Sequence, residues 1–336
     1  MSFWAQSPGP HWSDCFWTYF SCTGTPHAYP IRKLPLDKPK SNFGEIALAS
    51  QEDALEISLF LQKHFKITQK SQCFLSQEKL VQGMERGWIV VFLRNQDGLI
   101  CGTIASRPLG TCHFQIKRRG EFVRSKCPNV GYIDFFCVHP DFQKSGVGSD
   151  LLRWIDYYTS KQHRYIHVFQ KEVTPLYALP PLWKGMYIVR EVPFRTTNPK
   201  ITPVSQRSLP PQLHFPFSMT FVHEQKAFLP DTHILKYNCN TFTIFVAITD
   251  TFHRAAGGSI GEVLFYRIEG QEFPSKKNIA AAIEEVIETS GYHYILMDES
   301  IPHQDIRGWQ QDAHYYMYCY NVNPRIFFTC HPELLL

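Results

Sequence analysis

Ile133–Ser149 reads I-D-F-F-C-V-H-P-D-F-Q-K-S-G-V-G-S and carries the strongest structural signal in the chain. The apolar run ending at Val138 has the length of a β-strand, and a helix is expected from about Gly146 to Ser160. Gly146 and Gly148 lie where that helix would begin, so the backbone can approach a ligand closely there. The free N–H groups and the dipole of a helix N-terminus favour an anion such as a pyrophosphate. Lys144 adds positive charge, and the stretch therefore predicts a phosphate-binding turn.

The frame Q-x-x-G-x-G, set directly after a strand that ends in V-H-P, resembles the coenzyme A loop of the GNAT superfamily of N-acyltransferases. The chain contains neither the G-x-x-x-x-G-K-[ST] frame of a nucleotide P-loop nor the G-x-G-x-x-G frame of a dinucleotide site. A lone GxG before a helix also occurs in an ordinary tight turn, which is the alternative. The resemblance implies a bulge in the preceding strand whose N–H groups face the thioester carbonyl, where such donors contribute a few kcal/mol each.

The remaining periodicities predict a mixed α/β fold, in which two GNAT-like halves form one saddle-shaped sheet. Helices are expected over 51–66, 76–86, with Ser76 as N-cap, and 278–290. Further strands are expected over 88–94, 99–107, 165–169, 234–249, 262–268, 292–297 and 315–320, with a basic, polar excursion at 117–124. We divide the chain into an N-terminal arm (1–45), a first GNAT-like domain (46–195), a proline-rich linker (196–216) and a reduced second domain (217–336).

Composition excludes several classes of protein. The 336 residues are 44% hydrophobic and 19% charged, which is typical of a globular chain. The formal charge of +4 is scattered, so we expect no nucleic acid partner. No apolar run approaches the roughly 18 residues of a membrane span. The N-terminus lacks the features of a signal peptide, and ten scattered cysteines show no metal-site spacing. We therefore expect a monomeric cytoplasmic protein without metal or permanent cofactor.

Several stretches, in order along the chain, resemble glycylpeptide N-myristoyltransferase, a family within that superfamily. They are Phe3-Trp4-Ala5-Gln6, Gly87-Trp88, Asp134–His139 (DFFCVH), His314–Tyr318 (HYYMY) and the terminal leucines 334–336. In that family the first segment lies on coenzyme A. The amides at positions matching Phe135 and Phe136 form the oxyanion hole, and the chain's own terminal carboxylate is the base. The resemblance thus implies myristoyl transfer from acyl-CoA to the N-terminal glycine of a protein.

Carried over residue by residue, the resemblance assigns catalytic roles to the Phe135 and Phe136 amides and to the Leu336 carboxylate. Candidate substrate contacts are Asp134, Tyr316 and Tyr318, although packing within the sheet explains both tyrosines better than substrate contact does. The expected acyl-CoA contacts are Phe3, Trp4, Phe135, Phe136, Cys137, Val138, Gln143, Lys144, Ser145, Gly146, Val147, Gly148 and Ser149.

The chain departs from the family where the phosphate loop has glycines in place of basic residues and where Asp134 replaces an asparagine. It is also short. Acyl-CoA binding is therefore better supported than peptide specificity. The alternatives are a GNAT acetyltransferase acting on a small amine or a protein lysine, and an inactive acyl-CoA-binding protein. A nucleophilic Cys137 with His139 is a weaker alternative, because no nucleophile motif surrounds them.

Overall fold

The computed structural model describes residues 37–41, 43–65, 72–118, 121–172, 176, 181, 183–193, 197–205, 212–214, 219–222, 232–270, 274–303 and 308–320. Phe3, Trp4 and Leu336, three of the predicted site residues, lie outside these ranges. No helix of the described residues is long and apolar enough to cross a membrane.

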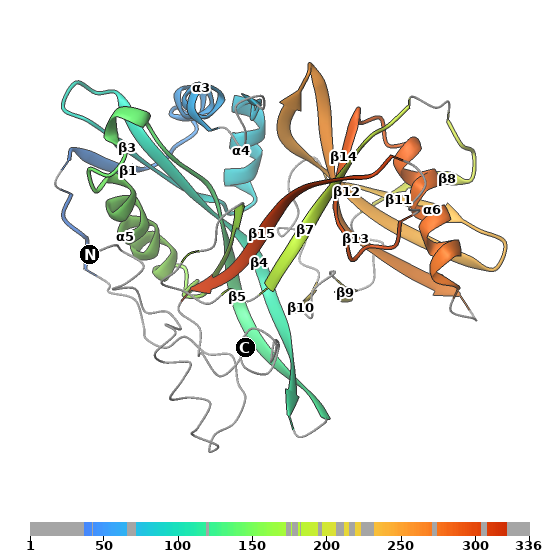
Figure 1. Ribbon diagram of the computed structural model, residues 1–336. Coiled ribbons are helices and arrows are strands. Elements are labelled where there is room, and N and C mark those ends of the chain that lie inside the picture. Colours follow the sequence, from blue (N-terminus) through green and yellow to red (C-terminus); the bar gives the residue numbers. More distant parts are fainter. Residues whose placement is uncertain are drawn as a thin grey trace.

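Helices and strands alternate in the mixed order that the periodicities predict (Figure 1). The helices are α3 (Ala54–His64), α4 (Gln77–Glu85), α5 (Val147–Ser160) and α6 (Lys276–Glu288), with a 3-10 turn η1 (Pro140–Phe142). Strands of the first half are β1 (Glu45–Leu48), β2 (Gln72–Cys73), β3 (Ile89–Arg94), β4 (Ile100–Arg118), β5 (Glu121–Val138) and β6 (His167–Glu172). The others are β7 (Trp183–Glu191), β8 (Ile201–Val204), β9 (Gln212–His214), β10 (Met219–Val222), β11 (Thr232–Asn238), β12 (Phe242–Ala255), β13 (Gly258–Gly270), β14 (Tyr294–Asp298) and β15 (Gln310–Tyr320).

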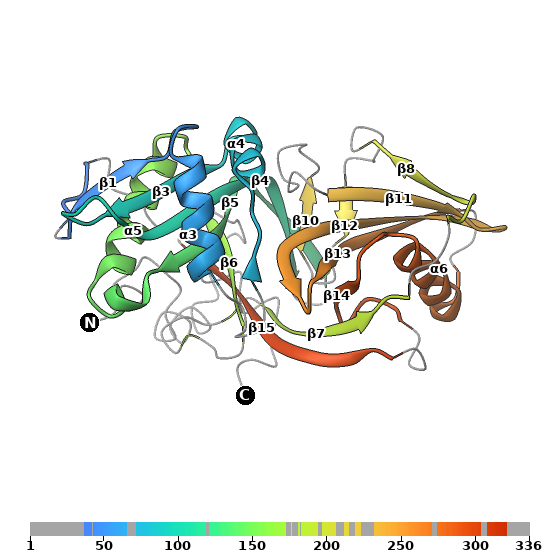
Figure 2. The same ribbon diagram turned by 90° about the horizontal axis from the view of Figure 1, so that it is seen from above.

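One sheet joins both halves. Its order is β1-β3-β4-β5-β6-β15-β7-β14-β13-β12-β11-β8, with β2, β9 and β10 paired beside this path. The last strand, β15, lies between β6 of the first half and β7 of the second, and is antiparallel to both. Figures 1 and 2 show β15 and β7 crossing the middle of the molecule, between the helical layers of the two halves. The predicted single sheet is confirmed, and β15 is the strand that joins its halves.

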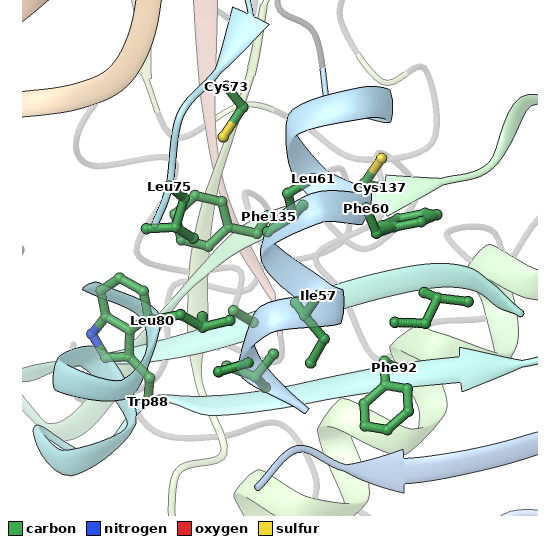
Figure 3. Close-up of a cluster of buried hydrophobic side chains, with 14 of the residues drawn as sticks. Ile57, Phe60, Leu61, Cys73, Leu75, Leu80, Trp88, Phe92, Phe135 and Cys137 are labelled. Atoms are coloured by element: carbon green, nitrogen blue, oxygen red, sulfur yellow. The ribbon is translucent and has the colours of Figure 1, made fainter. Parts of the chain in front are cut away.

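Separate apolar cores hold the helices on the sheet. On one face of the first half, α3 and α4 bury Ile57, Leu61 and Leu80 against Trp88 and Phe135 (Figure 3). Leu151 and Ile155 of α5 pack on the opposite face. In the second half, α6 covers β11–β14 with a core of its own. Ser76 caps α4 as predicted, its hydroxyl accepting a hydrogen bond from the Lys79 amide. The first half is thus a three-layer unit with a helix layer on each face.

Three expectations need correction. The predicted strand 234–249 is two antiparallel strands, β11 and β12, because the chain reverses between Asn238 and Phe242. The basic excursion at 117–124 is the end of a long hairpin, with Arg118 opposite Glu121, so β4 and β5 are much longer than their apolar runs. The segment predicted as a linker contains β8, which pairs with β11 at the sheet edge. The division into domains itself stays a prediction.

Candidate functional site

A β-bulge interrupts β5 at Phe135 and Phe136. Thr103 pairs with Cys137 and Ala105 with Asp134, so two residues of β5 face the single Ile104 of β4. Phe135 has a φ of +49°, a left-handed conformation that non-glycine residues adopt only at a cost of about 1–2 kcal/mol. Strain of this kind gathers at functional sites, where the surrounding structure enforces it. The bulge that the GNAT resemblance implies is therefore present at the expected position.

Side chains of β4 and of β5 itself fix the bulged peptide. The Phe135 N–H donates to Asp134 Oδ1 at 2.9 Å, and the Phe135 carbonyl accepts from the buried Thr103 hydroxyl at 3.1 Å. Asp134 is in turn held by Arg107 at 3.4 Å, and that guanidinium lies 4.3 Å from the Tyr132 ring centroid. The Phe135 amide, predicted as an oxyanion donor, is thus bonded to Asp134 in this structure. The amide of Phe136, the second residue of the bulge, is the other N–H group that was predicted as an oxyanion donor.

The strands beside the bulge diverge. β5 and β6 run parallel and pair only at Gly131, Tyr132 and Ile133, whereas β6 continues to Glu172 alongside β15. From Asp134 onward, β5 has no pairing with β6 among the described residues. Phe136, just beyond this point, keeps 39% of its surface exposed, unlike the apolar side chains around it. The pairing of β5 with β6 therefore ends next to the strained peptide.

The loop after β5 leads directly into α5. Lys144 and Gly146 both have positive φ values, +64° and +110°, which turn the chain tightly before the helix. The first helical hydrogen bond runs from the Asp150 amide to the Gly146 carbonyl at 3.1 Å. The amides of residues 147–149 consequently precede the helical hydrogen-bond ladder, and an anion can accept from them. Gln143, Lys144 and Ser145 are exposed around this turn.

Gly148, in the first turn of α5, lies close to side chains of β5. A Cβ on Gly148 would lie 3.1 Å from Cζ of Phe136 and 3.7 Å from Cγ2 of Val138. A Cβ on Gly146 would lie 3.0 Å from the Phe43 ring. The first turn of α5 thus lies against the Phe136 ring, which projects from the bulge, and glycine leaves the backbone of the turn uncovered at this point. Such an arrangement can bind a phosphate at one end and polarise a carbonyl at the other.

The structure argues against a cysteine nucleophile. Cys137 is buried in the core between the sheet and α3 (Figure 3), and this burial raises the pKa of its thiol to about 12. His139 contacts the His64 ring at 4.4 Å, and its Nδ1 accepts from the Asp141 amide at 3.2 Å. Cys137 is therefore a core residue, and the described residues contain no group of three or more His, Cys, Asp or Glu that could hold a metal ion.

The tyrosines predicted as substrate contacts pack within the sheet. Tyr318 is fully buried, stacks on Phe169 at 5.2 Å, and its hydroxyl accepts from the Leu176 amide at 2.7 Å. Tyr316 is part-buried against the same cluster. Tyr318 has no exposed surface in this structure, and its role as a substrate contact stays a prediction. The packing alternative explains both tyrosines.

Sequence reasoning missed polar residues where the two halves meet. Glu262 of β13 accepts a hydrogen bond from the Tyr187 hydroxyl of β7 at 2.8 Å, and the same hydroxyl lies 3.1 Å from Gln170 Oε1 of β6. Arg107 of β4 and Glu172 of β6 act electrostatically on Glu262. The available signal was Glu262, which directly precedes the apolar residues 263–265 in the predicted strand 262–268. Its partners are distant in sequence, so their association could not be inferred.

Comparison with known proteins agrees with this geometry. Residues 61–177 match the model of the Acetyltransferase (GNAT) family. No curated protein matches the chain in sequence. Among solved structures, Saccharomyces cerevisiae N-myristoyltransferase with bound myristoyl-CoA is similar over 96% of this chain and 92% of its own, with a TM-score of 0.63 and 13% identity. The same yeast enzyme with myristoyl-CoA and inhibitors gives a TM-score of 0.65 at 11% identity, covering 96% of this chain and 89% of its own.

The structural similarity establishes the fold, but sequence identities this low do not identify the substrate. Both the family match and the bulge lie in the first half, whereas the structural likeness extends over nearly the whole chain. Residues 61–177 therefore match the GNAT family model, and the fold of the chain as a whole, with two GNAT-like halves, is similar to that of the yeast N-myristoyltransferase.

Proposed function

We propose that the protein is an acyl-CoA-dependent N-acyltransferase in which an amine attacks the thioester directly. One observation carries the proposal: the strained Phe135–Phe136 bulge lies against the glycine turn at the start of α5. The amides of 147–149 bind the pyrophosphate of coenzyme A, with Lys144 beside them. The thioester carbonyl then lies at the bulge, where the Phe136 amide donates to the developing oxyanion.

The strained peptide suits this role because it is held rigidly. Thr103 holds the carbonyl of Phe135 and Asp134 holds its amide, so the donor that follows has a fixed direction. A preorganised donor needs no rearrangement as charge develops, and removing one such donor typically costs about 10²–10³ in kcat. The buried Cys137 takes no part, so no covalent intermediate forms.

The finer proposal is transfer of a long acyl group, myristoyl, to the N-terminal glycine amine of a protein. It rests on the sequence resemblance at both ends and on a structural likeness that covers the second half as well as the first. Phe3 and Trp4 are proposed to lie on the acyl-CoA, and the Leu336 carboxylate is the base that the resemblance implies. A GNAT acetyltransferase acting on a small amine or a lysine is the second candidate, favoured by the family match over residues 61–177.

A turnover panel separates these candidates. Acetyl-CoA, octanoyl-CoA and myristoyl-CoA are each offered with three acceptors: a glycine-started peptide, the same peptide N-acetylated and carrying one lysine, and spermidine. Release of free thiol measures transfer, and mass spectrometry locates the acyl group. We expect the highest rate for myristoyl-CoA with the glycine peptide. Preference for acetyl-CoA with lysine or spermidine would select the acetyltransferase, and binding without any transfer would reject an enzyme of either kind.

A further inference from the structure

A carboxylate and a hydroxyl from different strands meet at the junction of the two halves. Glu262 of β13 and Tyr187 of β7 are joined by a 2.8 Å hydrogen bond. Gln170 of β6, 3.1 Å from the same hydroxyl, also bonds Glu172 at 3.3 Å. β6 is the strand that diverges from the bulged β5. The Tyr187 hydroxyl therefore links Glu262 to the part of β6 that lies beyond its pairing with β5.

Glu262 lacks a cation of its own. Within the described part of the chain, Tyr187 is the only side chain that forms a hydrogen bond with it. Arg107 acts on it from a distance, but that guanidinium forms its salt bridge with Asp134. Glu262 is partly buried. A carboxylate withdrawn from water is normally paired with a positive charge, so Glu262 is suited to a cationic ligand.

The same carboxylate is within electrostatic reach of the bulge. Asp134, the residue that bonds the Phe135 amide, acts on Glu262, as does Arg107 beside it. Tyr132, two residues before Asp134, also experiences the charge of Glu262. The geometry agrees: the Tyr187 hydroxyl links Glu262 to Gln170, and Gln170 follows Phe169, which pairs with Ile133 two residues before Phe135.

Burial raises the pKa of Glu262 to about 7. The groups facing it from other strands act in both directions. The Tyr187 hydrogen bond and Arg107 lower this pKa, whereas the negative charges of Glu172 and Asp134 raise it. A carboxylate that exchanges its proton near neutral pH can act as a general acid or base there.

We propose that Glu262, in place of the Leu336 carboxylate that the resemblance implies, is the general base that takes the proton of the acceptor's ammonium group, an assignment that rests on the proposed N-acyltransferase function. The carboxylate removes one proton from the ammonium and becomes neutral, which leaves an amine with a free lone pair. The amine nitrogen attacks the thioester carbon, and a C–N bond forms. When the tetrahedral intermediate collapses, the C–S bond breaks, and the second nitrogen proton leaves with the coenzyme A sulfur as a thiol. Tyr187 is a positioning residue that holds the carboxylate.

The chemistry favours an α-amine as acceptor. An α-ammonium group has a pKa of about 8, so transfer of its proton to Glu262 is unfavourable by only about tenfold. A lysine ammonium, with a pKa near 10.4, would make the same transfer unfavourable by about 10³-fold. Glu262 is thus matched to an N-terminal amine, in agreement with the glycine acceptor proposed above.

The test compares Glu262→Gln with Glu269→Gln, a control on the exposed end of the same strand. kcat/KM is measured from pH 6 to 9.5 with the acyl-CoA and glycine peptide that the turnover panel selects. We expect a loss of about 10²-fold or more for Glu262→Gln at pH 7.5, the usual scale of base catalysis. The loss should shrink above the pKa of the amine, where neutral amine becomes abundant. Glu269→Gln should match the wild type, and calorimetry should show undiminished acyl-CoA binding by Glu262→Gln.

The pH profile of the Tyr187→Phe variant is a measurement that general destabilisation of the protein would not change. Loss of its hydrogen bond raises the pKa of Glu262, so the acid limb of kcat/KM should shift to higher pH. An enzyme extended at its C-terminus should keep the wild-type acid limb. A Glu262→Gln enzyme with the wild-type rate and profile would overturn the assignment, as would loss of activity confined to the extended enzyme, which would make Leu336 the base. Failure of the wild type to acylate any acceptor would instead reject the proposed function.

Discussion

Replacing Gly146 and Gly148 together by valine should abolish acyl-CoA binding while leaving the fold intact. Gly146 has a φ of +110° and its Cβ would meet the Phe43 ring, so a side chain there costs about 1–2 kcal/mol in stability. The new Cβ of Gly148 meets the far end of the part-exposed Phe136 ring at 3.1 Å, and that ring can move aside. The fold therefore loses little stability, but the space between the helix N-terminus and the bulge is filled.

The expected loss of affinity follows from the contacts that the phosphates would forfeit. A hydrogen bond to a charged group contributes about 1.5–3 kcal/mol. Losing two of the three amides at 147–149 costs about 3–6 kcal/mol, which corresponds to roughly 10²–10⁴-fold in Kd. Isothermal calorimetry with a non-reactive acyl-CoA thioether measures this change directly.

Gly291→Val is the matched control. Gly291 also has a positive φ, +81°, and nothing lies within 4 Å of its added Cβ, so this variant has similar backbone strain far from the loop. Its acyl-CoA affinity should equal that of the wild type, while both variants melt at lower temperatures. If the folded double variant binds acyl-CoA as tightly as the control, the α5 turn is not the phosphate site.

Three further predictions concern the acyl chain, the thiol and the bulge. Myristoyl-CoA should raise the melting temperature well above acetyl-CoA at equal concentration, since about 0.8 kcal/mol is available for each of a dozen additional buried methylenes; equal shifts would favour an acetyltransferase. Cys137→Ala should keep kcat within a few fold, because burial raises the pKa of that thiol to about 12. A loss of about 10³-fold in kcat, measured by thiol release, would instead support Cys137 as a nucleophile. Thr103→Val should lower the free energy of unfolding by about 1–3 kcal/mol and also lower kcat, because the buried Phe135 carbonyl loses its donor. The control is Thr249→Val, which breaks the hydroxyl pair with Thr232 and should destabilise the protein in denaturant titrations without changing kcat. An unchanged kcat for Thr103→Val would show that the bulge does not contribute to catalysis.

The first half of the fold could be predicted because its signals are local. An apolar strand followed by a glycine turn and an amphipathic helix specifies β5 and α5 without help from the rest of the chain. The strand pair β11 and β12 was read as one strand because both are apolar on each side of a short turn. The long β4–β5 hairpin was missed beyond its apolar part, since its outer residues are polar and basic. Strand pairing across the sheet stabilises such segments, and local periodicity does not report it.

The site divides in the same way. The bulge position followed from a motif, although Asp134 bonding the Phe135 amide depends on side-chain geometry that no motif encodes. The role of Tyr318 stays a prediction, because a row of tyrosines has the same sequence pattern whether it faces a ligand or a neighbouring strand. Glu262, Tyr187 and Arg107 lie on three different strands, and only the arrangement of the sheet brings them together. Residues associated by tertiary structure alone remain beyond sequence patterns.

A crystal structure of the complex with a non-reactive acyl-CoA thioether ketone tests the central claim most directly, because the ketone oxygen marks the position of the thioester carbonyl. We predict that this oxygen lies about 3 Å from the Phe136 amide nitrogen, the distance of an oxyanion-hole hydrogen bond. The pyrophosphate should lie at the amides of residues 147–149, and the acyl chain should enter where β5 and β6 diverge. A complex with coenzyme A bound elsewhere, or with its carbonyl out of hydrogen-bond reach of the bulge, would contradict the account.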